Sequence, residues 1–245
     1  MAYDFKSEED VKEFIKNLGI EYRFGCYSEK NPEVCHLLGD YLEAISKDFE
    51  KAAVVYRSNC DDYKYGKSCL KYGTYMLTGK GVRKSDQKVA FDYFEKGCEL
   101  GNETACLHQG LLYICENEEK RIVRDVRKGM SLLEKSCYAK NANACYYLSG
   151  MYISGVKKKQ IDKNLTDLDG YEIEKDMKKA FTFASEGCNL GNIYSCANLS
   201  QMYRKGEGVA KNQELADKYK AIALDLQDQI NSNKTLTFQE GLPST

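Results

Sequence analysis

The sequence predicts an all-α solenoid of five consecutive helix pairs. Two observations lead to this fold class. The chain has 245 residues but only 2 prolines, which favours long uninterrupted helices, because proline breaks the interior of a helix. Ten of its 11 cysteines also fall into five pairs of nearly constant spacing. These pairs recur at the interval that is typical of a helical hairpin repeat.

The spacing of the cysteines defines the repeat. Members of a pair are eight or nine residues apart, and the second members of the first four pairs follow at steps of 34, 37 and 39 residues. The last step is 51 residues, which we interpret as one repeat plus an insertion. The pairs are Cys26–Cys35, Cys60–Cys69, Cys98–Cys106, Cys137–Cys145 and Cys188–Cys196.

The elements follow in order along the chain. An N-terminal segment, residues 1–31, contains a leading helix over Glu8–Leu18, which comes before the first repeat. Five repeats come next, and a flexible tail ends the chain. We place the repeats at residues 32–65, 66–101, 102–141, 142–191 and 192–230, and the tail at 231–245.

The fourth and fifth repeats differ from the others. Repeat 4 contains a charged insertion at residues 155–175, which has no apolar period and is therefore expected to form an exposed loop. Repeat 5 ends in a helix from Gln213 to about Ile230, where Leu224 stands at the position of the expected cysteine. This helix is expected to cap the array, since no repeat follows it.

Other residue types also recur at fixed positions relative to the cysteine pairs. Small residues recur four positions after each second cysteine and would let a neighbouring helix approach closely; they are Gly39, Gly73, Gly110, Ser149 and Ser200. Aspartate or asparagine precedes the second helix of each pair, where its side chain can cap the helix N-terminus. The expected caps are Asp48, Asp86, Asp125, Asp176 and Asn212.

Each cysteine pair spans the junction between one helix pair and the next. A disulfide there would join neighbouring hairpins, and closing so short a loop stabilises a fold by roughly 2–3 kcal/mol. The alternative is reduced, buried thiols that pack as small apolar side chains. A metal site is disfavoured, because a junction offers only two cysteines and the chain has no C-x-x-C motif. We therefore favour disulfides, with Cys115 left over.

Charge and hydropathy exclude several classes of protein. The formal net charge is −1, from 36 basic and 37 acidic residues, so non-specific electrostatic binding of nucleic acid is not expected. No apolar run is long enough for a membrane span. The first ten residues, MAYDFKSEED, are acidic and precede no apolar stretch. We therefore expect neither a secretory signal nor an arginine-rich presequence.

The repeats resemble Sel1-like repeats, a branch of the tetratricopeptide-type solenoids, in the pattern A-C-x-x-L/x-G-x-x-Y, G-x-G-V and D-x-x-K-A. Two segments are similar to a narrower, cysteine-bridged set, the mitochondrial assembly factors of cytochrome c oxidase. They are DFKSEEDVKEFIKNLGIEYRFGCYSEKNPEVCHLLGDYLEAI and NIYSCANLSQMYRKGEGV. The resemblance extends from Asp4 to about Leu224 and implies a right-handed solenoid.

The resemblance also implies a function. Members of that set support the biogenesis of respiratory chain complex IV in the mitochondrial intermembrane space. The implied protein is a soluble interaction scaffold or chaperone and not an enzyme. Its implied partners are proteins of complex IV assembly and the oxidative import machinery of that compartment. Two alternatives stay open: a haem-linked or thiol–disulfide factor in the same compartment, and a secreted cysteine-rich repeat protein of the bacterial type.

Few residues are candidates for catalysis or for binding a cofactor. The chain has two histidines, His36 and His108, and no nucleophile motif, so no catalytic residue is expected. His108 and Cys115 are seven residues apart on one predicted helix and would face one way, about 10 Å apart along its axis. Both residue types ligate haem iron elsewhere, and haem is the cofactor that the resemblance implies for this face. The plainer interpretation is a partly exposed histidine and a spare thiol, with no cofactor required.

Tyrosines mark a candidate surface for partner proteins. One stands at a similar position in the first helix of each repeat, on the face expected to be concave. Tyrosine suits interfaces, because it combines an apolar ring with a polar tip. The alternative, that several of them pack inside the protein, stays open. The candidates are Tyr41, Tyr75, Tyr113, Tyr152 and Tyr203.

Overall fold

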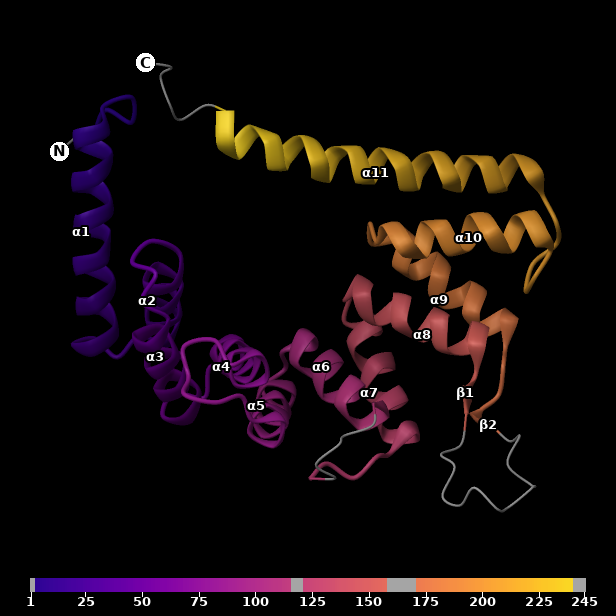
Figure 1. Cartoon of the computed structure of the whole chain (residues 1–245), viewed down its shortest axis with the longest axis horizontal. Coiled ribbons are helices and arrows are strands. Elements are labelled where there is room, and N and C mark those ends of the chain that lie inside the picture. Colours follow the sequence, from indigo (N-terminus) through magenta and orange to yellow (C-terminus); the bar gives the residue numbers. More distant parts are fainter. Residues whose placement is uncertain (1–2, 116–120, 158–170, 240–245) are drawn as a thin grey trace. The chain divides into compact units, whose positions relative to one another are not determined.

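The described part of the chain is almost entirely helical. The structure is a computed structural model that describes residues 3–115, 121–157 and 171–239 (Figure 1). Within these ranges it contains eleven helices and a single two-stranded sheet. The predicted fold class is therefore confirmed: a leading helix is followed by five helix pairs, with a disulfide at each junction.

The described helices form a leading helix and five pairs. The leading helix is α1 (Glu8–Tyr27). The first helices of the five pairs are α2 (Pro32–Ala44), α4 (Gly66–Thr78), α6 (Glu103–Ile114), α8 (Ala142–Ser154) and α10 (Ile193–Lys205). The second helices are α3 (Phe49–Asp61), α5 (Gln87–Glu99), α7 (Val126–Tyr138), α9 (Met177–Asn189) and α11 (Gln213–Gln239).

The chain forms two compact units. The first comprises residues 1–112 and 117–122, and the second residues 113–116 and 123–245. The first unit therefore holds α1 to α5 and most of α6, while α7 to α11 belong to the second. Each has a core between its helices: Leu38, Tyr56 and Phe94 are fully buried in the first, and Leu133 and Leu148 in the second.

The second helix of each pair begins where the sequence predicts. The side chains of Asp48, Asp86, Asp125 and Asp176 accept hydrogen bonds from backbone N–H groups in the first turns of α3, α5, α7 and α9. Asn212 accepts one from Leu215 at the start of α11. These contacts satisfy donors that a helix N-terminus leaves without an intrahelical partner.

The leading helix is longer than predicted. It was expected to end at Leu18 but continues to Tyr27. The residue after Leu18 is Gly19, which does not end the helix and instead permits close packing on α2. A Cβ built on Gly19 would lie 2.6 Å from Cζ of Tyr41. The additional turns place Cys26 within α1, where it is bonded to Cys35 of α2.

The last helix also extends further than predicted. It was expected to end near Ile230, and a flexible tail was expected over residues 231–245, but α11 runs to Gln239. The sequence from 231 to 239 contains neither glycine nor proline, so nothing in it breaks the helix. Residues 240–245 lie outside the described part of the chain.

The insertion in repeat 4 is only partly a loop. Its ends pair as β1 (Val156–Lys157) and β2 (Tyr171–Ile173), which are antiparallel. Arg124 binds Glu172 of β2, and this ion pair ties the short sheet to the segment before α7. The rest of the predicted loop, residues 158–170, lies outside the described residues.

No helix among the described residues is both long enough and apolar enough to cross a membrane.

Candidate functional site

The structure joins all five predicted cysteine pairs as disulfides. Their Cα–Cα distances lie between 4.5 and 4.9 Å, which is within the range that a disulfide requires. All ten cysteines are buried. Each bridge connects the end of one helix to an early position of the next, so it holds the first helix of a pair against the pair before it.

A second contact accompanies the bridges. The residue just before the first cysteine meets the residue just before the second, and both are small or short enough to let the helices approach. At Asn59 and Ser68 this contact is a hydrogen bond of 2.7 Å. At three other junctions a Cβ added to a glycine would lie within 3 Å of the facing residue. These are Gly25 with Val34, Gly97 with Ala105, and Gly187 with Ser195.

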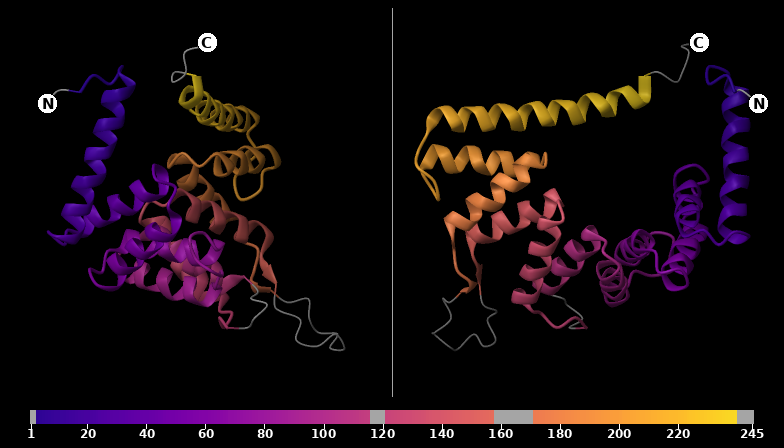
Figure 2. Two further views of the ribbon diagram at one scale, coloured as in Figure 1. Left: turned by 60° about the vertical axis from the view of Figure 1, so that its left-hand side comes forward. Right: turned by 180° about the vertical axis from the view of Figure 1, so that it is seen from behind.

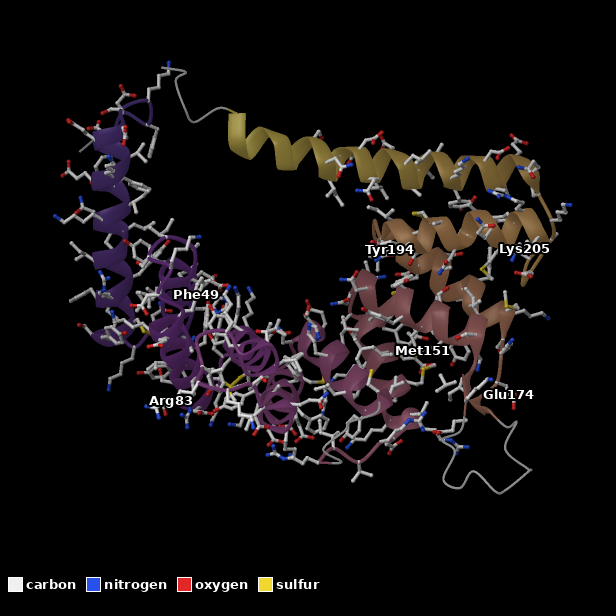
Figure 3. The ribbon with its side chains drawn as sticks, viewed as in Figure 1. Phe49, Arg83, Met151, Glu174, Tyr194 and Lys205 are labelled. Carbon is white, nitrogen blue, oxygen red and sulfur yellow. A yellow bond between two sulfur atoms is a disulfide. The ribbon has the colours of Figure 1, made fainter. Side chains whose placement is uncertain are left out.

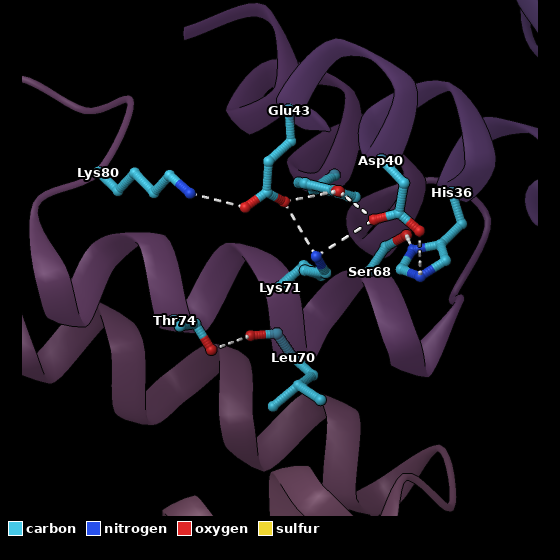
Figure 4. A network of polar contacts seen from close by, with 9 residues as sticks. His36, Asp40, Glu43, Ser68, Leu70, Lys71, Thr74 and Lys80 are labelled. Atoms are coloured by element: carbon cyan, nitrogen blue, oxygen red, sulfur yellow. Dashed lines mark hydrogen bonds and ion pairs between the residues drawn. The ribbon is translucent and has the colours of Figure 1, made fainter. Parts of the chain in front are cut away.

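A network of charged side chains joins the first two helix pairs (Figure 4). Glu43 of α2 accepts hydrogen bonds from the ammonium groups of Lys71, at 2.9 Å, and Lys80, at 2.7 Å. Lys71 also lies 3.2 Å from Asp40. The hydroxyl of Tyr56, a buried residue of α3, donates to Asp40 at 2.5 Å. The network thus links α2, α3 and α4.

Burial and charge shift the pKa values of this network. Burial opposes ionisation of Glu43, but the hydrogen bonds and charges of Lys80 and Lys71 outweigh it and lower the pKa of Glu43 to about 2. Burial, followed by the bond to Asp40, raises the pKa of Tyr56. The carboxylate is therefore ionised and the phenol neutral at neutral pH. This pattern is that of a structural ion-pair network, because both carboxylates of α2 are paired with lysines of the next repeat.

His36 belongs to the same network. Its Nδ1 lies 3.0 Å from Oγ of Ser68, and its Nε2 lies 3.7 Å from Asp40. Burial lowers the pKa of His36, although the nearby Asp40 carboxylate acts in the opposite direction. His36 therefore has a packing role between α2 and α4. The network itself was missed; its signal was the acidic pair Asp40 and Glu43 on one face of a helix.

His108 is half-buried in α6. Its ring stacks on Phe94, with 5.0 Å between centroids and 25° between planes. Burial lowers the pKa of His108, so the imidazole is neutral at neutral pH. Neither ring nitrogen has a hydrogen-bond partner among the described residues. A neutral imidazole with a free nitrogen fits metal coordination, and haem ligation by His108 therefore stays a prediction.

Cys115 is the one cysteine outside the bridges, and it is exposed. It does not continue α6 as predicted, because that helix ends one residue earlier, at Ile114. The last carbonyl groups are taken by other partners: the Arg124 side chain donates to the carbonyl of Ile114, and the Asp125 amide donates to that of Tyr113. The helix that would place the Cys115 thiol on the same face as His108 therefore ends before Cys115. Glu116, Glu118 and Glu119, which follow in the sequence, lie outside the described residues.

Two of the five candidate tyrosines are not available to a partner. Tyr75 is 2% exposed and packs edge-on against Tyr56, and Tyr152 is 7% exposed and stacks on Phe183. The prediction of a partner contact is therefore wrong for these two, because α3 of the preceding pair covers the ring of Tyr75 and α9 of the same pair covers that of Tyr152. The other three are half-buried: Tyr41, Tyr113 and Tyr203.

Exposed tyrosines of the second unit were missed; they are Tyr138, Tyr147 and Tyr194. Tyr194 of α10 is 62% exposed, and its ring lies 5.3 Å from that of Tyr146 of α8. Tyr147, the residue after Tyr146, is also exposed. Tyr147 and Tyr194 stand in the first half of their helices, whereas the candidate tyrosines stand in the second half.

A groove between α10 and α11 lies beside Tyr194. The two helices run side by side in each view of the structure (Figures 1 and 2). The groove has a volume of about 350 Å³. Its α10 wall contains Ile193, Tyr194, Ala197, Ser200, Gln201 and Arg204, and its α11 wall contains Lys220, Ala223, Leu224 and Gln227. Tyr194 lies near the start of α10, whereas Lys205 marks its end (Figure 3).

A metal centre has no counterpart in the described ranges, where no three histidine, cysteine, aspartate or glutamate side chains gather in a suitable cluster.

Comparison with protein families identifies the repeats. The Sel1 repeat family matches the chain at residues 66–102, 107–141, 167–192 and 193–219. Among solved structures, a Sel1 repeat protein from Oxalobacter formigenes is similar in fold, with a TM-score of 0.63 and 20% sequence identity. The match covers 79% of this chain and 69% of that one.

Two curated relatives match nearly the whole chain. The cytochrome c oxidase assembly factor 7 homolog of Drosophila melanogaster is 53% identical over 99% of this chain and 98% of its own length. Cytochrome c oxidase assembly factor 7A of Xenopus laevis is 39% identical over 91% of both chains. Matches of this extent show common descent across all the repeats, including the leading helix.

Proposed function

Because the chain belongs to the Sel1-repeat family of cytochrome c oxidase assembly factor 7, we propose that it supports the biogenesis of respiratory chain complex IV. The observation that carries this proposal is the 53% identity to the Drosophila relative over 99% of the chain. The relatives are named for this role, and the match leaves no repeat of this chain without a counterpart.

The compartment that we propose is the mitochondrial intermembrane space. Disulfides persist where the surroundings are oxidising and are rare in a reducing cytosol. The five bridges lie at the five junctions, so reduction would remove the covalent link between every pair and its neighbour. An oxidising compartment of the mitochondrion therefore suits both the fold and the role.

The mode of action that we propose is that of a protein-interaction scaffold or chaperone. Repeats of paired helices present extended surfaces on which partner proteins bind. The chain would act by holding partners of complex IV assembly, and the oxidative import machinery would bind it transiently while the bridges form.

A rescue experiment tests the role. Cells that lack the corresponding gene should show less assembled complex IV on native gels, and the parent chain should restore it. A chain with all ten paired cysteines changed to serine is the matched variant, since it keeps Cys115 but loses every bridge. It should fail to rescue. Normal complex IV in the deletion cells would contradict the proposed function.

Localisation and redox state are tested separately. After the outer membrane is opened, added protease should degrade the chain while matrix proteins survive. Alkylation of the unreduced protein should label one thiol, Cys115, because the other ten cysteines are paired. Labelling of several paired cysteines in natively isolated protein would contradict the oxidised fold, and protection from protease would contradict the compartment.

A further inference from the structure

The last helix pair keeps the surface that receives a following helix, although the chain places no helix there among its described residues. At every earlier junction a cysteine near the end of one helix is bonded to the next helix, and at four of the five the residue before that cysteine also contacts the next helix. Helix α11 is the second helix of the last pair. Aligning its cap Asn212 with Asp176 of α9 places Leu224 at the position of Cys188 and Ala223 at that of Gly187.

A comparison of α9 with α11 shows which residues of α11 lack a covering helix. Gly187 of α9 faces Ser195 of α10, and Cys188 is bonded to Cys196 of that helix. Both residues of α9 are buried by α10. Their counterparts on α11 differ in their surroundings: Ala223 is 9% exposed, and Leu224 is 56% exposed. Helix α11 thus keeps a small residue, Ala223, at the position of Gly187, and it carries the apolar Leu224 in place of Cys188.

The groove beside these residues has the form of a helix-binding site. One wall is a stripe on α10, with Ile193, Ala197 and Gln201 spaced four residues apart. The other wall is a stripe on α11 that contains Ala223 and Leu224. Two neighbouring helices whose side chains repeat at this spacing form a channel that accepts the ridge of a third helix.

The charges of the groove specify the partner further. Arg204 lies on the α10 wall and Lys220 on the α11 wall, and no acidic residue lines the groove. Both cations are exposed and neither forms an ion pair with another described residue. A bound helix with acidic side chains along its edge would therefore be favoured over a basic one.

We propose that the groove between α10 and α11 binds an amphipathic helix of a partner protein, which takes the place of the first helix of a sixth pair. The helix presents small and apolar residues to Ala223 and Leu224 and carboxylates to Arg204 and Lys220. The binding is non-covalent, because Leu224 replaces the cysteine that would form the bridge. This inference rests on the repeat geometry and does not depend on the role in complex IV assembly.

A synthetic helix provides the test. The probe is a fluorescein-labelled peptide with the sequence of α10, held helical by a hydrocarbon staple on its outer face. It carries Cys196→Ser, Arg204→Glu and Lys205→Glu. Binding to the oxidised full-length protein is measured by fluorescence anisotropy, with circular dichroism confirming that each protein variant is folded. We expect saturable binding that Leu224→Glu weakens at least tenfold, because the substitution places a charge in the apolar groove.

Control variants separate the groove from other apolar surface. Val54→Glu introduces the same charge at a residue of α3 that is 68% exposed, and it should leave binding unchanged. Tyr194→Ser should weaken binding, since Tyr194 lines the groove. A second peptide that retains Arg204 and Lys205 should bind less tightly than the acidic one, and Lys220→Glu in the protein should reverse this preference.

Three results would overturn the proposal. The first is no binding of the acidic peptide to the parent protein. The second is equal binding to the parent and Leu224→Glu proteins. The third is a concentration-dependent dimer of the parent protein that Leu224→Glu dissociates, because the occupant would then be a second copy of this chain. Each result is obtained with purified protein, so it leaves the complex IV rescue experiment unaffected.

Discussion

Gly39 of α2 faces the ring of Tyr56 so closely that a Cβ added to Gly39 would lie 2.3 Å from Cε1 of that ring. Tyr56 is fully buried, and its hydroxyl is held by Asp40. The same relationship recurs in the next pair, where a Cβ on Gly73 would lie 2.7 Å from the ring of Phe94. A glycine in the first helix thus sets how closely the second helix of each of these pairs approaches.

The first prediction follows from this contact. Gly39→Ala should destabilise the protein by about 1–3 kcal/mol, the usual cost of overpacking a closed core. This cost exceeds the gain of about 1 kcal/mol or less that alanine brings to a helix interior. The free energy of unfolding in urea measures the difference. Gly150→Ala is the matched control, because a Cβ on Gly150 of α8 meets nothing within 4 Å. It should be neutral or slightly stabilising, and an equal loss in both variants would contradict the argument.

The second prediction concerns the unequal value of the bridges. Replacing both Cys98 and Cys106 with serine should lower the melting temperature more than replacing Cys26 and Cys35. The first pair joins interior repeats, which need neighbours on both sides, whereas the second joins only the leading helix. Each bridge closes a short loop and is worth roughly 2–3 kcal/mol by the chain-entropy argument, so the packing of the neighbouring helices decides the order. Equal losses, or the reverse order, would reject this reasoning.

The third prediction concerns pH. The pKa of Glu43 is lowered to about 2 in the folded protein, from an ordinary value of 4.5, so the folded state binds fewer protons than the unfolded state between these values. The stabilisation by ionised Glu43 is therefore fully present above about pH 4.5 and is lost as the pH falls towards 2. We expect it to be about 1–2 kcal/mol, because its lysine partners are partly exposed to solvent, which screens their charge.

Glu43→Gln isolates this contribution. The free energy of unfolding of the parent should exceed that of Glu43→Gln at pH 6, and the difference should shrink as the pH is lowered to 2.5. Glu8→Gln serves as the control, since Glu8 forms its ion pair with Lys12 at the exposed surface of α1. A difference that stays constant across this pH range would show that the carboxylate charge does not act as proposed.

The fourth prediction concerns haem. If the chain binds haem, the neutral and unpaired imidazole of His108 is its ligand, so titration of the protein with haem should shift the Soret band. His108→Ala should abolish this shift. His36→Gln is the control, because its amide can keep the hydrogen bond to Ser68. An unaltered shift in the His108 variant would remove this residue as a ligand, and no shift in the parent protein would reject haem binding.

The repeats could be predicted because their signals are local. A disulfide requires two Cα atoms about 4.4–6.8 Å apart, so the recurring pair spacing places each chain reversal. An aspartate such as Asp86 caps the helix that follows it, and the cap depends only on its own turn. The ends of α1 and α11 could not be predicted as well. Gly19 can either end a helix or admit a neighbouring ring, and only the packed structure shows that it admits Tyr41.

The exposure of single residues was harder to predict than the helices. Helical phase shows which side chains share a face, but not which neighbouring helix covers that face. Tyr75 and Tyr41 occupy the same position in successive repeats, yet Tyr75 is buried against Tyr56 while Tyr41 is half-buried. The network around Glu43 depends on Lys80, which is 37 residues away in the sequence. Its formation requires the turn after α4 to return to α2, which no local pattern specifies.

The order of the bridges has a mechanical consequence. Each disulfide closes before the next one begins along the sequence, so no loop encloses another. Tension applied to the two ends of the chain would therefore meet no nested disulfide loops, and each bridge would keep only the short segment between its own two cysteines from extending. The oxidised chain could unfold under force one hairpin at a time. Once the force is removed, it could refold with every cysteine still bonded to its partner.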